Sequence, residues 1–111
     1  MKNLKKYIVK SNETLNFVAE KILLNNSRTV FVEDKKKIIG VITEGDVLRS
    51  LVRNDSTHIL ASDIMNKSFK FLETRNKEIS KKIFKKFKIT AIPILNKKMK
   101  IIDIIELWNV V

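Results

Sequence analysis

Apolar residues recur along the first half of the chain at two spacings, and each spacing predicts a different kind of element. Between Leu15 and Leu24 they stand three or four positions apart, which is the period of a helix with one buried face. Short runs of β-branched and aromatic residues lie around this helix and are typical of strands. The predicted order is a strand at 7–9, a helix at 15–24, strands at 29–32 and 38–42, and a helix after Thr43 that carries Val47 to Val52 on one face.

The second half of the chain repeats this order. Residues 54–62 have the polar composition of a connector, and a second amphipathic helix follows, with lysines on the faces that its apolar residues leave free. Pro93 lies within a predicted strand and indicates an edge or a locally unpaired position. The predicted pieces are short extended segments at 64–65 and 69–72, a helix opened by 74–76 with Ile79, Ile83, Phe84 and Phe87 on one face, strands at 89–95 and 99–102, and a final helix at 104–111.

Two displacements bring the halves into correspondence. Moving the first half by 62 positions lays Val30 on Ile92, and moving it by 60 lays Ile42 on Ile102. A tandem repeat whose halves are each too small to bury a core implies two units that pack face to face. We therefore expect an α+β fold with approximate two-fold symmetry, in which any ligand-binding corner occurs twice.

The turn between the strand at 38–42 and the following helix has a chemical interpretation. Both glycines of the chain, Gly40 and Gly45, lie here, which indicates a close approach of backbone to another element or to a ligand. Thr43 stands at the expected N-cap of the helix, and Asp46 follows three positions later. Such a corner could bind a phosphate and a ribose diol, but a simple capping box would have the same spacing.

Composition narrows the function classes. The chain has no cysteine and a single histidine, His58, so thiolate nucleophiles, Cys-ligated zinc, His-based metal sites and a Ser-His relay are all disfavoured. No nucleophile-base pair or P-loop is visible, which makes an enzyme the least favoured class. No apolar run reaches membrane-spanning length and no signal peptide is visible, so a cytoplasmic protein without membrane contact is expected.

The charge is the one compositional extreme. A formal net charge of +11 favours anionic partners such as nucleotides, nucleic acid or an acidic surface, although a lysine-rich proteome would give the same value. The lysines between Lys81 and Lys88 could bind nucleic acid, but no aromatic residue is interleaved on that face to stack with bases. A solvated helix face is the simpler interpretation. Trp108 fits the core or a dimer contact better than a ligand platform.

Three motifs in order resemble a CBS-domain pair, also called a Bateman module. They are Gly40-Val41-Ile42-Thr43-Glu44-Gly45-Asp46, the run Ala61-Ser62-Asp63-Ile64-Met65, and Thr90-Ala91-Ile92-Pro93-Ile94. The likeness covers nearly the whole chain. It implies a tandem pair of β-α-β-β-α CBS motifs, over residues 1–57 and 58–111, packed with pseudo-two-fold symmetry around two clefts that often bind adenosine nucleotides.

The resemblance also implies roles for individual residues. In this family the hydroxyl of the glycine-containing motif contacts phosphate and its aspartate holds the ribose, which implicates Thr43 and Asp46. The base lies against the other repeat. The ligand-binding residues expected from the family are Thr43, Asp46, Ile42, Ile64, Ile89, Thr90 and Ala91. Apart from the resemblance, Arg49, Arg28 and Lys67 are candidate phosphate partners on charge alone, but an ordinary surface charge is the simpler interpretation of each.

The second motif departs from the family pattern. When the first half is moved by 60 positions, Lys100 stands in the place of Gly40 and Asp103 in the place of the phosphate-binding Thr43. Glu106 stands in the place of Asp46, which the family uses to hold the ribose. A carboxylate about 4 Å from a phosphate would cost roughly 4 kcal/mol at an effective dielectric of 20. We therefore expect the second cleft, with Arg28 and Thr29 on its far wall, to be empty or to accept an uncharged nucleoside, while Asp103 and Glu106 cap the final helix.

The sequence thus predicts a non-catalytic regulatory module that binds an adenine nucleotide such as AMP, ADP or ATP as a regulatory ligand, with no required cofactor and no metal. A homodimer is expected from apolar helix faces. A narrower likeness to CBS pairs joined to sugar-phosphate isomerases or sugar nucleotidyltransferases suggests a fused or separate enzyme partner. The alternative is a basic nucleic-acid-binding or protein-interaction scaffold whose ligand clefts are vestigial.

Overall fold

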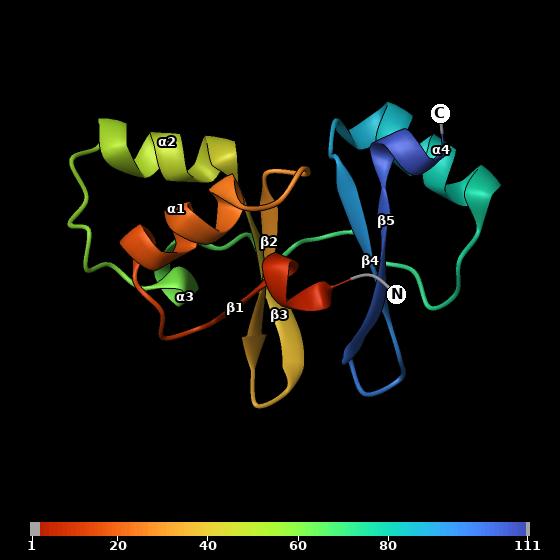
Figure 1. Cartoon of the computed structure of the whole chain (residues 1–111), viewed down its shortest axis with the longest axis horizontal. Coiled ribbons are helices and arrows are strands. Elements are labelled where there is room, and N and C mark those ends of the chain that lie inside the picture. Colours follow the sequence, from red (N-terminus) through yellow and green to blue (C-terminus); the bar gives the residue numbers. More distant parts are fainter. Residues whose placement is uncertain (1–2, 111) are drawn as a thin grey trace.

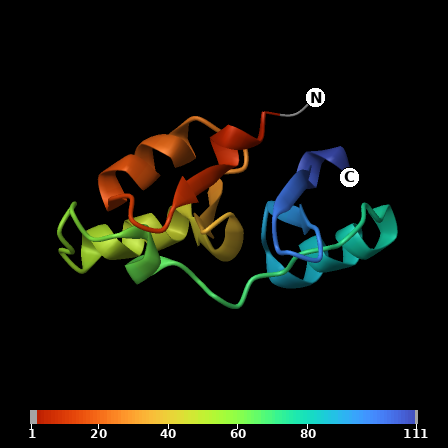
Figure 2. The same ribbon diagram turned by 90° about the horizontal axis from the view of Figure 1, so that it is seen from below.

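The computed structural model describes residues 3–110 and shows two α/β units side by side (Figure 1). Seen from below, the segment between α3 and α4 passes along one side of the molecule and links the units (Figure 2). The elements are η1 (Leu4–Tyr7), β1 (Ile8–Lys10), α1 (Leu15–Leu23), β2 (Thr29–Asp34), β3 (Lys37–Thr43), α2 (Glu44–Val52), α3 (Ala61–Ile64), α4 (Lys77–Phe87), β4 (Ala91–Leu95), β5 (Ile101–Glu106) and η2 (Leu107–Asn109).

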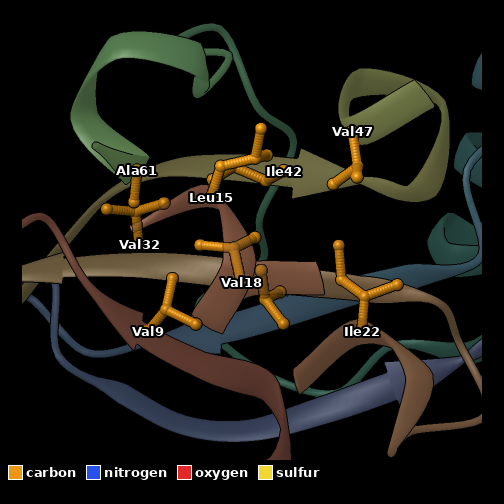
Figure 3. Packing of buried hydrophobic residues seen from close by; sticks show 9 residues of the cluster. Val9, Leu15, Val18, Ile22, Val32, Ile42, Val47 and Ala61 are labelled. Carbon is orange, nitrogen blue, oxygen red and sulfur yellow. The ribbon is translucent and has the colours of Figure 1, made fainter. Parts of the chain in front are cut away.

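The first unit is a three-stranded sheet with helices α1 and α2 on one face (Figure 1). Strand β1 pairs in parallel with β2, and β2 pairs antiparallel with β3. Helix α1 begins at Thr14, whose side chain accepts a hydrogen bond from the Phe17 N–H. The apolar faces of sheet and helices meet in one core (Figure 3), formed by Val9, Leu15, Val18, Ile22, Val30, Val32, Ile42, Val47 and Ala61.

The second unit is a shorter version of the first. Strands β4 and β5 form an antiparallel pair, and α4 takes the place of α1. A single parallel bridge between Leu72 and Ile94 stands where β1 pairs with β2 in the first unit. Phe84, Ile92, Ile94, Ile105 and Val110 form its core. The predicted α+β fold is therefore confirmed, and the helix–strand–strand order of the first unit recurs in the second.

Two local predictions are wrong. The final helix expected at 104–111 is absent from the described residues of that segment, because β5 continues to Glu106 and only the short η2 follows. Ile104 and Ile105 are fully buried as strand partners of Pro93 and Ile92, and this packing outweighs the helical spacing. Of the segment at 64–65, expected to be extended, Ile64 is instead the last residue of α3, whereas Met65 at the C-cap has the extended backbone that was predicted.

The strand register also corrects the correspondence between the units. Val30 pairs with Ile42 in the first unit, and Ile92 pairs with Ile105 in the second. The displacement of 62 positions therefore holds between β2 and β4. Between β3 and β5 the displacement is 63 positions, and not the expected 60. Glu106, and not Asp103, thus occupies the position of Thr43.

A further apolar cluster joins the units. Phe31 and Ile38 come from the first sheet, and Leu95 and Ile104 come from the second, each at most 2% exposed. The Ile38 N–H also donates to the Met99 carbonyl oxygen at 2.8 Å, so backbone as well as side chains crosses the boundary. The units therefore share a core, as expected for halves that are each too small to bury one.

Beside this shared core lies a buried polar cluster. The Glu106 carboxylate accepts hydrogen bonds from the Tyr7 hydroxyl at 2.8 Å and from the Ser27 hydroxyl at 2.7 Å. All three residues are buried, and Tyr7 and Ser27 belong to the other unit. Burial, the hydrogen bond to Glu106 and the charge of that carboxylate raise the pKa of Tyr7 to about 12. The cluster therefore ties η1 and the loop before β2 to the end of β5.

The close packing at Gly40 predicts a large effect of one added methyl group. A Cβ at this position would lie 2.6 Å from the Met65 sulfur and 2.9 Å from the Met65 Cβ. Gly40→Ala is expected to lower the free energy of unfolding by about 1–3 kcal/mol through overpacking, as measured by urea denaturation. Gly45→Ala is the matched control. A Cβ at Gly45 would lie no closer than 3.4 Å to another atom, and Ala is favoured over Gly within a helix, so this variant should be at least as stable as the wild type. Equal stability of Gly40→Ala and the wild type would contradict the packing argument.

The Tyr7 cluster predicts a stability change at high pH. An unfolded tyrosine ionises near pH 10, so the contribution of the neutral Tyr7 hydroxyl is complete below pH 10 and is lost as the pH rises through the folded-state pKa of about 12. Between pH 10 and 12 the wild type should lose about 2 kcal/mol more unfolding free energy than Tyr7→Phe. Urea denaturation of both proteins across this range tests it, and parallel pH curves would refute it.

Candidate functional site

A cavity of about 260 Å³ opens between the two units, next to the start of α2. Strands β2 and β3 and helix α2 line it from the first unit, and the end of α4 with the start of β4 lines it from the second. The linker between α3 and α4 closes one side. The lining residues are Thr29, Phe31, Val41, Thr43, Asp46, Arg49, Asn66, Ser68, Phe69, Lys70, Phe87, Ile89 and Ala91.

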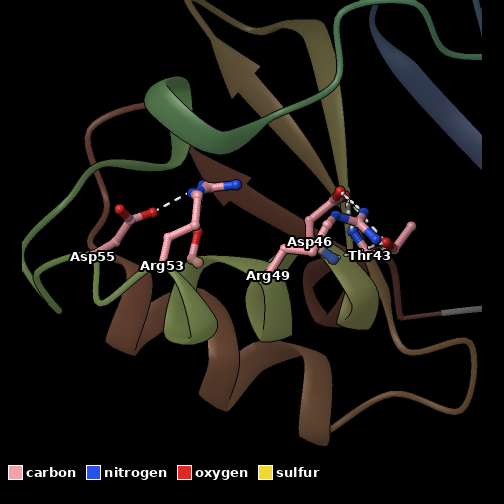
Figure 4. Close-up of polar contacts among 6 residues, drawn as sticks. Thr43, Asp46, Arg49, Arg53 and Asp55 are labelled. Carbon is pink, nitrogen blue, oxygen red and sulfur yellow. Dashed lines mark hydrogen bonds and ion pairs between the residues drawn. The ribbon is translucent and has the colours of Figure 1, made fainter.

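Thr43 and Asp46 meet at the start of α2 on the wall of this cavity (Figure 4). The Thr43 N–H donates to Asp46 Oδ2 at 2.8 Å, and the Asp46 N–H donates to Thr43 Oγ1 at 3.3 Å. These two bonds form the capping box that the spacing left open as an alternative. The same pair lines the cavity, so capping the helix also fixes a hydroxyl and a carboxylate at its wall.

The second carboxylate oxygen of Asp46 has a different partner. Arg49, one helical turn further along α2, donates to Asp46 Oδ1 (Figure 4). The Arg49 side chain is 65% exposed, so water screens this ion pair and its contribution to stability is small. Asp46 therefore has one oxygen committed to the fold and one whose present partner can be exchanged at little cost.

The opposite side of the cavity is apolar. Ile89 and Ala91 come from the second unit, and Phe31 and Val41 come from the first. Phe69 of the linker packs against the shared core beside them. Apolar lining residues of this kind suit an aromatic ring, and polar groups elsewhere in the lining can fix its orientation.

The structure brings together four of the predicted ligand-binding residues, namely Thr43, Asp46, Ile89 and Ala91. The other three predicted residues do not line the cavity. Ile42 is fully buried in the core of the first unit, and Ile64 packs against that same core. Thr90 lines an adjoining groove instead and donates to the Ser27 carbonyl oxygen at 2.7 Å.

Sequence reasoning missed most of the linker and aromatic lining. Phe69 and Lys70 reach the cavity from a segment without regular structure, and the Lys70 ammonium lies 4.4 Å from the centre of the Phe87 ring. Phe31 and Val41 are next to core positions in their strands, and alternation along a strand could have indicated that they face the other way. No such periodicity exists for the linker.

The residues predicted for a second cleft are dispersed. Arg28 and Thr29 line a groove near the start of α2. Asp103 lies in β5 and forms an ion pair with Arg75. Glu106 precedes η2 without a side-chain capping bond, so the expected Asp103–Glu106 capping pair is wrong. The carboxylate of Glu106, at the position of Thr43, is instead held by Tyr7 and Ser27.

The chemistry available at the cavity is binding of a ligand with a planar apolar part and polar or anionic groups. Arg49 and Lys70 supply positive charge at its wall, in a chain with a formal net charge of +11. Among residues 3–110, no group of three or more His, Cys, Asp or Glu side chains could hold a metal ion. No helix in the same range has the length and apolar character needed to cross a membrane.

Comparison with known proteins identifies the first unit. Residues 4–53 match the family model of the CBS domain. No curated protein sequence gives a significant match to the chain. The family model thus covers η1, both helices and all three strands of the first unit, together with the Thr43–Asp46 corner.

Solved structures extend the comparison to both units. A signal-transduction protein with CBS domains from Burkholderia ambifaria has a TM-score of 0.81 at 19% identity, over 94% of this chain and 78% of that one. A CBS-domain protein from Pyrobaculum aerophilum in complex with AMP has a TM-score of 0.80 at 15% identity, over 98% and 89%. The CBS-domain pair of protein MJ0100, with 5′-methylthioadenosine and S-adenosylmethionine, has a TM-score of 0.76 at 19% identity, over 90% and 80%.

At identities this low the structural matches establish the fold of the whole chain, while the family model establishes the relationship of its first unit. Residues 4–53 thus match the CBS-domain family model, and the chain as a whole has the fold of a CBS-domain pair.

Proposed function

We propose that the chain is a non-catalytic regulatory module that binds an adenine nucleotide in the cavity between its two units. The observation that carries this proposal is the composition of that cavity. The hydroxyl of Thr43 and the carboxylate of Asp46, from the first unit, face the apolar residues Ile89 and Ala91 of the second. A nucleotide needs both, because its base is flat and apolar while its ribose and phosphate are polar.

Asp46 is suited to hold the ribose. A ribose diol offers two hydroxyl donors, and the Asp46 oxygen that now accepts from Arg49 could accept from them instead. The displaced Arg49 guanidinium would then be available to a phosphate, for which it is a strong charged donor. Thr43 Oγ1 now donates to Asp46 Oδ2 at 3.0 Å and would have to turn to a phosphate, while the N–H groups at the start of α2 lie on the same side.

Related proteins support the ligand class. The protein from Pyrobaculum aerophilum binds AMP, and the CBS pair of MJ0100 binds 5′-methylthioadenosine and S-adenosylmethionine. These ligands share an adenosine group. We propose the same group for this chain, with the adenine between Ala91 and the aromatic side chains of Phe31 and Phe69.

The regulatory effect would follow from the position of the cavity. A ligand that contacts both units stabilises the mutual arrangement that it fits best, and its binding free energy sets the size of that population shift. A partner, whether a fused domain or a separate enzyme such as one acting on sugar phosphates, would respond to this arrangement.

Isothermal titration tests the proposed ligand. AMP, ATP and adenosine titrated into the purified chain are expected to show one saturable site per chain. Asp46→Asn keeps an oxygen at the helix cap but removes the charge and one acceptor, and should weaken binding by about tenfold. Asp63→Asn makes the same change in α3, where Asp63 accepts from the Leu60 N–H outside the cavity, and should bind as the wild type does.

Absence of saturable binding by all three ligands, or an equal loss in Asp46→Asn and Asp63→Asn, would refute this function. In the first case, binding of a polynucleotide that weakens steeply with salt would favour the alternative, a basic nucleic-acid-binding module.

The exposed face of α2 supports a second part of the proposal, self-association. Leu48, Leu51 and Val52 are 56%, 51% and 81% exposed on this helix, and Leu23 of the neighbouring α1 is 66% exposed. Apolar side chains gathered in this way mark an association surface. A homodimer with two-fold symmetry would cover this face on both copies.

Light scattering coupled to size exclusion tests the dimer. The wild type is expected to have the mass of two chains, and the double variant Leu48→Lys, Leu51→Lys the mass of one, because two charges would be buried without partners. Ile79→Lys changes a similarly exposed residue on α4 and should leave the dimer intact. A monomeric wild type at high concentration would contradict the assignment.

A further inference from the structure

A groove of about 290 Å³ lies on the second unit, between α4 and η2. The described residues that line it are all different from those of the cavity between the units. Phe84, Leu107 and Val110 form its apolar floor. Lys81 and Lys85 line the side that α4 provides, where a spacing of four residues places them one above the other. The groove therefore combines an apolar base with two positive charges.

The walls of the groove are fixed by the fold. Phe84 belongs to the core of the second unit, and Leu107 packs against that core. The Leu107 N–H donates to the Thr90 carbonyl oxygen at 2.9 Å, and the Val110 N–H donates to the Leu107 carbonyl oxygen at 3.2 Å. These bonds hold η2 beside the start of β4. The groove is therefore formed before any partner arrives.

The first unit has a groove at the corresponding place. Helices α1 and α4 begin at N-caps that lie 62 positions apart, and each cap side chain accepts from the N–H three residues on. The displacement of 62 lays Ile22 on Phe84, and the displacement of 63 lays Val47 on Val110. Ile22 and Val47 line a groove between α1 and α2. The same position is thus hollow on both units.

The two grooves differ in the side chains along their edges. Ala19 and Leu23 line the groove of the first unit, beside the apolar face proposed for self-association. Their counterparts in the second unit are Lys81 and Lys85. The glutamate that lines the first groove has an apolar counterpart in η2. The second groove has therefore exchanged an apolar edge for a basic one, which indicates a different kind of partner.

The charge of the second groove favours a partner with carboxylates. Among residues 3–110, neither Lys81 nor Lys85 takes part in an ion pair, and both are exposed. No acidic side chain in that range lines the groove. Two copies of this groove placed face to face would bring lysines against lysines, which is unfavourable. The pattern therefore disfavours self-association through this face.

The depth of the apolar floor indicates the shape of the partner. Phe84 and Val110 are each only 6% exposed, so a flat lipid surface or a stacked base does not reach them. A row of side chains that projects from a helix does, and such ridges fit the grooves beside other helices. Four residues of α4 rise about 6 Å along its axis, which matches carboxylates one turn apart on a second helix.

We propose that this groove binds an acidic amphipathic helix of a partner protein. Apolar residues at spacings of three and four on that helix pack onto Phe84 and Val110, and its flanking carboxylates pair with Lys81 and Lys85. The contact lies on the unit that contributes Ile89 and Ala91 to the cavity. It requires no nucleotide, so the inference stands independently of the proposed ligand.

Selection of displayed helical peptides on the full chain tests the proposal. The peptides keep leucine at positions i, i+3 and i+7 of one face, while the flanking positions vary among glutamate, glutamine and lysine. Peptides with glutamate flanks are expected to be enriched. A synthetic peptide of this kind should bind at least about tenfold more tightly than its lysine-flanked counterpart. Binding is followed by the fluorescence of Trp108, the single tryptophan, which lies next to Leu107 in η2.

Charge reversal supplies the matched variants. Lys81→Glu, Lys85→Glu should bind the glutamate-flanked peptide at least about tenfold more weakly than the wild type and should select lysine-flanked peptides instead. Lys82→Glu, Lys86→Glu makes the same change of charge on α4 outside the groove lining and should keep the wild-type preference. All four lysines are exposed, so the variants are expected to fold, which urea denaturation checks.

Four outcomes would overturn the proposal. The first is enrichment of neutral or lysine-flanked peptides, or of none. The second is an equal loss of binding in the two double variants, because attraction to α4 as a whole would then explain it. The third is selective binding of phosphatidylglycerol vesicles through Lys81 and Lys85 without peptide binding, which would assign the lysines to a membrane surface. The fourth is a fall in the mass of the wild-type assembly on Lys81→Glu, Lys85→Glu, which would make a second copy the occupant.

Discussion

The burial of apolar side chains between the two units is the constraint on which the rest of the structure depends. Each half of the chain is too short to bury a full core of its own, and Phe31, Ile38, Leu95 and Ile104 reach full burial only across the boundary. The cavity exists because this contact joins the sheets at one place and leaves the start of α2 apart from β4. Folding and site assembly are therefore one event, since neither unit alone presents two walls.

The same packing makes the two units unequal. Their hairpins correspond closely, yet Thr43 of the first unit is matched by Glu106 in the second. A buried carboxylate needs partners, and the Tyr7 and Ser27 hydroxyls supply them from the opposite unit. The position that presents a hydroxyl to a cavity in one unit thus locks the units together in the other. Pseudo-symmetry in the backbone does not carry over to the chemistry.

Local patterns predicted much of this molecule and failed where distant contacts decided the outcome. The Thr43–Asp46 corner follows from a strand, a turn and a helix that are contiguous in sequence, so spacing was enough to find it. The extension of β5 through Ile104 was missed because its pairing with β4 decides the conformation, and this contact is not visible in spacing alone. Phe69 was missed for a related reason, since the linker is placed by the shared core and not by its own periodicity.

The contact between Arg49 and Asp46 has a consequence for selectivity if the cavity binds nucleotides as proposed. A neutral molecule with a diol could displace Arg49 from the carboxylate, but it would leave the guanidinium without a counterion. A molecule that brings its own anion replaces the lost partner. Because Arg49 is 65% exposed and its ion pair contributes little, this competition gives a modest preference for phosphorylated ligands over sugars and polyols that offer the same pair of hydroxyl groups to Asp46.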